Sequence, residues 1–229
     1  MMIEAEWWDY ENPDEWADAV AGDIGFIVES ATDARDAALL ALPAAPECAP
    51  VIARLAKARL PWKKVAVIPT HDRLVPVSDE RSTVRALAAA FIPVGARVLP
   101  IATENPDVAL AGNAADARLA DLPWPPDLAW LTVDSDGNTA GLTSGPDLQK
   151  ALDAPKARRA VGLRADDGEP GVSLTRAAIL SARTILITLV GEDARQVLEQ
   201  AIADGQSSKL PIGRVLAEAE QPIDIHWYA

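Results

Sequence analysis

The feature that most constrains this 229-residue chain is the alternation of short aliphatic runs with longer stretches of helical periodicity. The clearest run is Thr184–Val190, which is too short for a buried helix and suits a strand covered on both faces. Repeated strand, helix and strand favour right-handed crossovers onto a mainly parallel sheet with helices on both faces. The other segments read in this way are strands over 38–42, 65–68, 97–101 and 128–133, and helices over 13–30, 47–58, 81–91, 106–120 and 192–203.

Past Gly145 the pattern becomes less regular. Two short strands, 159–163 and 172–175, flank a turn-rich stretch, and a helix over 212–219 precedes a closing strand over 223–228. We expect His226 in that closing strand to face outward, and Trp7 and Trp8 to cover an interface or dock on the surface. The sequence thus predicts one doubly wound α/β domain over residues 1–229, with a smaller and less regular C-terminal part.

The charge of the chain limits its partners. The formal net charge is −13, whereas binding to a nucleic acid backbone needs Lys and Arg gathered on one face. We therefore expect no nucleic acid partner. An acidic surface also gives no general attraction for an anionic sugar phosphate, so such a ligand would need a local cluster of donors.

Cysteine and histidine usage indicates the compartment and excludes most metal chemistry. The single cysteine, Cys48, cannot form an internal disulfide and fits a reducing compartment. The acidic N-terminus lacks the features of a secretory signal, and no stretch reaches the roughly 18–20 apolar residues of a membrane span. The only histidines, His71 and His226, are far apart. We expect a cytoplasmic protein without a membrane span, a metal site or a cofactor.

Ligands of such sheets bind beyond the carboxyl ends of the strands, where the strand order reverses. The loops after Leu42, Ile68, Val133 and Val190 are therefore the places to search.

His71 follows one of these strands, and an imidazole with an ordinary pKa near 6.5 suits a general base. Neighbours on an extended segment point to opposite sides, so Asp72 need not orient His71. The alternative is a loop histidine without a chemical role. Arg73 could bind an anion. The alternative is that Asp72 and Arg73 have a structural role and hold the loop against the sheet.

Several motifs resemble those of the 6-phosphogluconolactonase family. Residues 60–76, LPWKKVAVIPTHDRLVP, are similar to the family stretch in which Leu-Pro-Trp leads into a strand ending in Gly-Asp-Glu-Arg and Val-Pro. Residues 126–131, PDLAWL, with DGNTA at 136–140, resemble the family's strand and its Asp-Gly-His-Thr-Ala-Ser signature. The match covers nearly the whole chain and implies the fold shared with glucosamine-6-phosphate deaminase and ribose-5-phosphate isomerase.

The loop after the first strand of this pattern departs from the family. There the family carries Ser-Gly-Gly-Ser-Thr-Pro, whose small residues let backbone N–H groups and hydroxyls wrap a phosphate. Residues 43–48 read PAAPEC, so the glycines and hydroxyls are absent, prolines remove donors, and Glu47 brings a negative charge. The resemblance therefore implies a loop that rejects phosphate.

Other family positions are also changed. Asn138 stands where the family has its acid–base histidine, and an amide cannot exchange a proton near neutral pH. His71 replaces an aspartate, Asp72 replaces a glutamate, and Arg73 is retained. A family arginine, asparagine and lysine become Gly171, Thr83 and Ala194, with Arg195 beside the last. The resemblance implies that any catalysis uses His71, Asp72 and Asn138, and that any substrate contacts use Arg73, Thr139 and Arg195.

Three hypotheses for function follow. The one we favour is a degenerate member of this family, weak or noncatalytic, that pairs with itself or with an active relative. The second is an active 6-phosphogluconolactonase of the pentose phosphate pathway, and the third is a hydrolase of an unphosphorylated lactone. In the last two the partner is a small-molecule sugar lactone, and whether the chain is an enzyme stays open.

Overall fold

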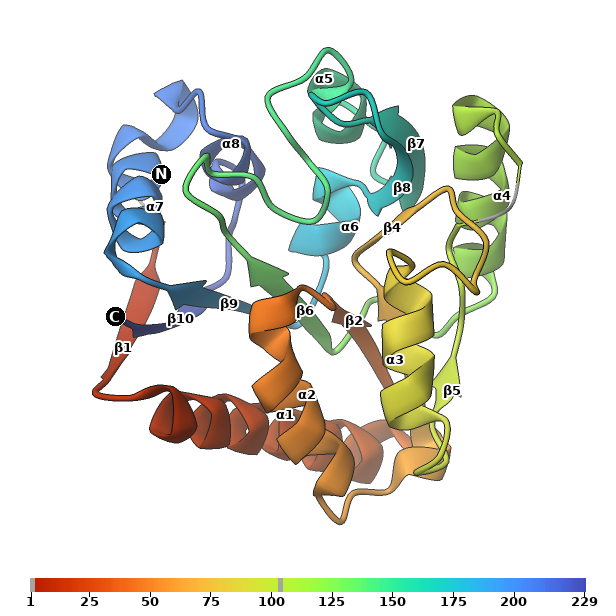
Figure 1. Ribbon diagram of the computed structural model, residues 1–229, viewed down its shortest axis with the longest axis vertical. Coiled ribbons are helices and arrows are strands. Elements are labelled where there is room, and N and C mark those ends of the chain that lie inside the picture. The colour runs from red at the N-terminus through yellow and green to blue at the C-terminus, as the bar shows by residue number, and fades with distance from the viewer. Residues whose placement is uncertain (1–2, 103–104) are drawn as a thin grey trace.

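The computed structural model describes residues 3–102 and 105–229 and contains a seven-stranded parallel sheet (Figure 1). The strand order is β1-β10-β9-β6-β2-β3-β5. The predicted strands 38–42, 184–190 and 223–228 agree with the structure at both ends. The strands are β1 (Ala5–Tyr10), β2 (Ala38–Leu42), β3 (Val65–Pro69), β5 (Arg97–Val98), β6 (Leu128–Thr132), β9 (Thr184–Val190) and β10 (Ile223–Tyr228).

Helices cover both faces of this sheet, as the aliphatic runs predict (Figure 1). In β2, Leu39 and Ala41 join one hydrophobic core, whereas Leu40 and Leu42 join the other, because alternate side chains of a strand point to opposite faces. One core contains α1 (Pro13–Arg35), α2 (Ala49–Lys57) and α3 (Thr83–Phe91). The other contains α4 (Val108–Ala120), α5 (Leu148–Leu152), α6 (Arg176–Leu180), α7 (Glu192–Asp204) and α8 (Pro211–Leu216).

Helix α1 is longer than its sequence pattern predicted. Asn12 caps its first turn by accepting from the backbone N–H of Glu15, with Pro13 as the first helical residue. The buried face continues through Ala31 and Thr32, beyond the predicted end at residue 30. The helix stops where Asp36 adopts a left-handed conformation and its N–H donates to the Thr32 carbonyl.

A second, antiparallel sheet forms the less regular part of the fold. It has the order β4-β8-β7, with β4 (His71–Arg73), β8 (Pro170–Leu174) and β7 (Ala160–Arg164). Helix α4 packs directly on β7, since a methyl group placed on Gly162 would lie 1.7 Å from the Val108 carbonyl oxygen. The absence of a side chain there lets the helix and the hairpin come into backbone contact.

The N-terminus and His226 differ from the predictions. Residues 5–10, for which no strand was predicted, form the edge strand β1, parallel to β10. His226 is buried, not outward-facing, because α1 covers that face of β10: the Nε2 atom of its ring lies 3.5 Å from the carboxylate of Asp23 in α1. The His226 ring bonds the Tyr10 hydroxyl (2.9 Å) and stacks between Trp8 and Tyr10. Burial lowers the pKa of His226 to about 4.

Cys48 is fully buried, as expected for a thiol that packs as a small apolar side chain. Burial raises the pKa of its thiol. Within the described part of the chain, no helix combines the length and the apolar character needed to cross a membrane.

Candidate functional site

The strand order of the main sheet reverses between β2 and β6. From β2 the sheet grows through β3 to β5, and from β6 it grows through β9 to β10. The loops that leave these two strands must therefore diverge, which opens a crevice beyond their carboxyl ends. A cavity of about 490 Å³ lies there, lined by residues from four segments: 43–47, 70–73, 80–86 and 132–143.

His71 lies in this cavity, on β4, and is partly buried. Its ring packs against two glycines: a methyl placed on Gly141 would come within 2.0 Å of the ring, and one on Gly171 within 2.9 Å. Gly141 has a φ of +69°, so both its conformation and its missing side chain are required. Burial, with a smaller effect of the Arg73 charge, lowers the pKa of His71 to about 4. The imidazole is therefore neutral at pH 7 and a weaker base than an ordinary histidine.

Asp72 points away from the cavity, as the alternation along an extended segment predicts. Its carboxylate accepts from the backbone N–H groups of Arg73, Thr83 and Val84, at 3.0, 2.7 and 3.1 Å, and from the Ser82 hydroxyl at 3.4 Å. Burial raises the pKa of Asp72, and these four hydrogen bonds oppose the rise. Asp72 thus holds the start of α3 against β4 and does not face His71.

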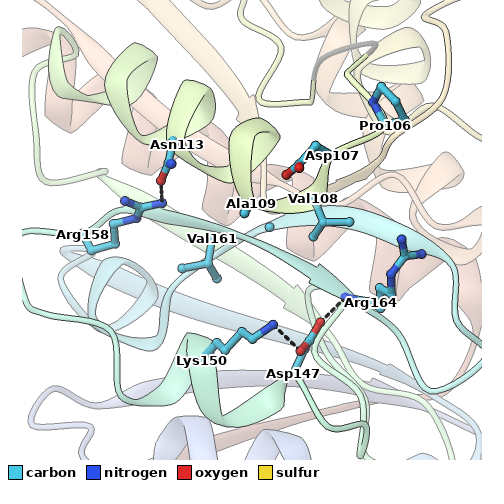
Figure 2. A pocket seen from close by; sticks show the side chains of 11 residues that line it. Pro106, Asp107, Val108, Ala109, Asn113, Asp147, Lys150, Arg158, Val161 and Arg164 are labelled. Atoms are coloured by element: carbon cyan, nitrogen blue, oxygen red, sulfur yellow. Dashed lines mark hydrogen bonds and ion pairs between the residues drawn. The ribbon is translucent and has the colours of Figure 1, made fainter.

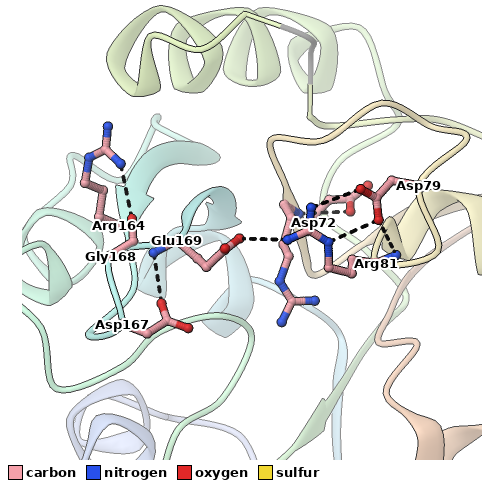
Figure 3. Close-up of polar contacts among 8 residues, drawn as sticks. Asp72, Asp79, Arg81, Arg164, Asp167, Gly168 and Glu169 are labelled. Carbon is pink, nitrogen blue, oxygen red and sulfur yellow. Dashed lines mark hydrogen bonds and ion pairs between the residues drawn. The ribbon is translucent and has the colours of Figure 1, made fainter.

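Arg73, two residues after His71, lines the cavity on the same side. Across the described ranges its guanidinium has no hydrogen bond or ion pair. Arg81, which also lines the cavity, is already engaged: it binds Asp79 at 3.0 Å and reaches Glu169 in the β7–β8 turn at 3.5 Å (Figure 3). Arg73 is therefore the cation that is free to meet a ligand.

The loop after β6 brings Asn138 and Thr139 into the cavity. Asp134 shapes this loop, because its carboxylate accepts from the backbone N–H groups of Asp136 and Asn138 and from the Asn138 side-chain amide at 3.0 Å. Asn138 is therefore bound to the loop itself. Thr139 is buried, and its hydroxyl is the one buried side-chain polar group without a hydrogen bond in the structure as described.

A second hollow of about 560 Å³ adjoins the cavity and shares Glu47 and Asp134 with it. It lies beyond β6 and β9, at the start of α7, where Glu192, Asp193 and Ala194 contribute to its lining. None of its lining residues is a Lys, Arg or His. The end of the site formed by the β2, β6 and β9 loops thus carries four carboxylates and no cation.

Arg195, the other predicted substrate contact, lines neither hollow. Its guanidinium lies 4.3 Å from the centre of the Trp227 ring and pairs with Asp9 at 3.1 Å and Glu199 at 2.9 Å. These contacts fasten α7 to β10 and β1. The structure therefore brings His71, Arg73, Asn138 and Thr139 together, and leaves Asp72 and Arg195 outside the cavity.

Another cavity, of about 600 Å³, lies between the start of α4 and β7 (Figure 2). Its basic side chains are occupied: Lys150 pairs with Asp147 at 2.5 Å, and Arg158 donates to Asn113 at 2.7 Å (Figure 2). We assign no ligand to it. In the described portion of the chain, no three His, Cys, Asp or Glu side chains converge on a metal-binding arrangement.

Sequence reasoning missed Asp134, Glu192 and Asp193 as parts of the site. A signal for Asp134 was present, because an acidic residue just before an Asp-Gly turn commonly accepts that turn's backbone N–H groups. The two residues at the start of α7 read as ordinary acidic first-turn residues, and only the strand order shows that they face the crevice.

Comparison with known proteins gives a consistent result. The family model described as "Glucosamine-6-phosphate isomerases/6-phosphogluconolactonase" matches residues 11–227. A 6-phosphogluconolactonase of Rhizobium meliloti is 31% identical over 223 residues, which cover 95% of this chain and 96% of that protein. One from Mesorhizobium japonicum is 31% identical over 226 residues, covering 96% and 94% of the two chains.

Solved structures share the fold. The crystal structure of a 6-phosphogluconolactonase from Shewanella baltica covers all of both chains with a TM-score of 0.91 at 24% identity. That of a putative 6-phosphogluconolactonase from Neisseria gonorrhoeae also covers both chains completely, with a TM-score of 0.89 at 22% identity. With the family model spanning almost every residue, the chain belongs to the glucosamine-6-phosphate isomerase/6-phosphogluconolactonase family.

Proposed function

We propose that this protein is a 6-phosphogluconolactonase-like member of sugar-phosphate metabolism in which hydrolysis of 6-phosphogluconolactone is weak or absent. The observation that carries the proposal is the charge of the second hollow, which lies beyond β6 and β9 and adjoins the cavity. Glu47, Asp134, Glu192 and Asp193 line it, without a lysine, arginine or histidine among its lining residues.

The electrostatic cost of a phosphate at this end can be bounded. Two unit charges about 4 Å apart interact by about 1 kcal/mol in water and about 4 kcal/mol at an effective dielectric near 20. These carboxylates are solvent-exposed, so the lower value is the better guide. For a dianion the penalty is about 2 kcal/mol for each carboxylate in contact, and no cation among the lining residues of this hollow offsets it.

Proton transfer is weakened as well. Asn138 cannot exchange a proton near pH 7 and is held by Asp134. His71 is neutral and can accept a proton, but a pKa of about 4 leaves it a poor base, since general bases work best with a pKa near the working pH. Both effects support a slow or absent reaction.

A second candidate is hydrolysis of an unphosphorylated lactone, which the position of His71 in the cavity favours. His71 would take a proton from water as the water oxygen attacks the lactone carbonyl carbon. The bond from that carbon to the ring oxygen would then break, and the ring oxygen would receive the proton. Arg73 would hold the carbonyl oxygen or the carboxylate formed from it.

Steady-state assays on a phosphorylated and an unphosphorylated gluconolactone separate these functions, with a His71→Ala variant as the control. A rate at background on both supports the main proposal. A rate on the unphosphorylated lactone alone that is lost in His71→Ala supports the second candidate. A kcat/KM for the phosphorylated lactone within the ordinary enzyme range, about 10⁴ M⁻¹s⁻¹ or more, would contradict the proposal.

Two further predictions belong with this function. We place the protein in the cytoplasm, in keeping with the single buried cysteine. We also expect it to pair with an active relative or with itself, which co-purification and sizing of the purified protein can test.

A further inference from the structure

The hydroxyl oxygen of Thr139 is itself buried and has no hydrogen-bond partner within the part of the chain that the structure describes. The residue is 3% exposed. By contrast, the Thr188 hydroxyl accepts from Trp130 at 2.8 Å, and the Thr175 hydroxyl donates to the Arg158 carbonyl at 2.7 Å. Buried hydroxyls are normally paired, because an unpaired one destabilises the fold. Something other than this chain is therefore expected to pair with Thr139.

Thr139 lines the cavity of about 490 Å³ beyond β2 and β6, so a ligand in that cavity can supply the partner. The cavity is rich in hydroxyl groups, since Thr70, Thr83 and Thr132 also line it. Hydroxyl groups both donate and accept, which suits a ligand that carries several hydroxyls of its own.

The charges of the cavity favour an uncharged ligand. Three carboxylates line it, those of Glu47, Glu80 and Asp134, against two guanidiniums. One guanidinium, that of Arg81, is already paired with Asp79 and Glu169. Glu47 and Glu80 have no hydrogen bond or ion pair in the described part of the protein. Free carboxylates accept hydrogen bonds from ligand hydroxyls and repel a ligand phosphate.

We infer that this cavity binds an uncharged, polyhydroxylated ring compound, a sugar or sugar lactone without a phosphate, and that the Thr139 hydroxyl donates a hydrogen bond to it. The lactone skeleton rests on the function proposed above. The absence of charge and the role of Thr139 follow from the cavity itself. Binding of this kind does not require that His71 be an active base.

The test uses D-glucono-δ-lactam, an uncharged ring analogue that resists hydrolysis, and its 6-phosphate. Titration calorimetry measures the Kd of each for the full-length protein and for Thr139→Val, which keeps the side-chain shape but removes the hydroxyl. Thr139→Ser keeps the hydroxyl and is the matched control. We expect the lactam to bind wild type and Thr139→Ser equally within about twofold, and Thr139→Val about threefold to tenfold more weakly, the range of one hydrogen bond.

The Tm of the ligand-free variants distinguishes a Thr139 hydroxyl that contacts a ligand from one that stabilises the fold. Removing an unpaired hydroxyl should leave the Tm of the ligand-free protein unchanged or higher in Thr139→Val. Thr175→Val, which deletes a paired hydroxyl at the start of α6, should lower the Tm. A lower Tm in ligand-free Thr139→Val, equal to that of Thr175→Val, would overturn the assignment of Thr139.

Binding of the lactam and of its 6-phosphate to the wild-type protein tests whether the ligand is uncharged. Failure of wild type to bind the lactam, or tighter binding of the 6-phosphate, would overturn this inference. Fast hydrolysis of 6-phosphogluconolactone would instead contradict the proposed function, and it is measured separately. The two failures are therefore distinguishable.

Discussion

Replacement of Gly141 by alanine tests whether His71 occupies the position on which the site depends. The added methyl would lie 2.0 Å from the His71 ring, closer than any van der Waals contact allows. It would also place a side chain on a residue with a φ of +69°. The left-handed conformation costs about 1 kcal/mol, and overpacking adds about 1–3 kcal/mol, so we expect a total loss of about 2–4 kcal/mol in the free energy of unfolding.

Gly168 provides the matched control. It has a φ of +86°, but a methyl placed on it meets nothing within 4 Å. Gly168→Ala should therefore lose only about 1 kcal/mol. Urea unfolding followed by tryptophan fluorescence measures both values. In a His71→Ala background the ring atoms nearest to the added methyl are absent, so the loss caused by Gly141→Ala should fall toward about 1 kcal/mol. Equal losses for the two glycine variants, or no relief in the His71→Ala background, would refute this position of the ring.

Two more predictions concern charge. Glu47→Gln should tighten the binding of a phosphorylated sugar ligand about fivefold to thirtyfold, because it removes about 1–2 kcal/mol of repulsion of a dianion. An unphosphorylated ligand should bind no more tightly, because the variant relieves no repulsion for it and replaces a carboxylate acceptor with a weaker amide acceptor. Parallel titrations in which both ligands bind more tightly to the same extent would contradict this. In the folded protein the pKa values of His71 and His226 are lowered to about 4, whereas both are about 6.5 in the unfolded chain. Between pH 6.5 and pH 4 the unfolded chain therefore binds more protons than the folded protein. The free energy of unfolding should fall as the pH drops from 6.5 to 4. Each histidine contributes at most about 1.4 kcal/mol per pH unit to the slope of the unfolding free energy against pH. His226→Gln should therefore reduce this slope. An unchanged slope would argue against a buried neutral His226.

The main sheet was predictable because its strands are covered on both faces. An aliphatic run such as 184–190 is too short for a buried helix and suits a strand that is covered on both faces, and its predicted ends agree with the structure. Strand β1 was not predicted, because its sequence, AEWWDY, carries acidic residues on an edge strand and lacks such a run. The prediction for His226 was wrong for a related reason. The alternation of apolar and polar residues in β10 indicates one solvent-exposed face, but α1 covers that face.

The candidate site was predictable only in part. The positions of His71, Arg73, Asn138 and Thr139 follow from the segments that leave β3 and β6, the two strands on either side of β2. Asp72 and Arg195 lie elsewhere, because side-chain direction and partner choice depend on packing: Asp72 turns to the start of α3, and Arg195 packs over Trp227. The convergence of Glu192 and Asp193 with Glu47 depends on strand order, which no local pattern contains.

The central claim is that the site formed by the cavity and the second hollow, which share Glu47 and Asp134, does not hold a phosphate. Calorimetric titration of the purified protein with 6-phosphogluconate and with gluconate measures this directly, since the two anions differ only in the phosphate. We predict that the phosphorylated compound binds no more tightly than gluconate. Binding at least tenfold tighter, abolished by inorganic phosphate as a competitor, would contradict the account.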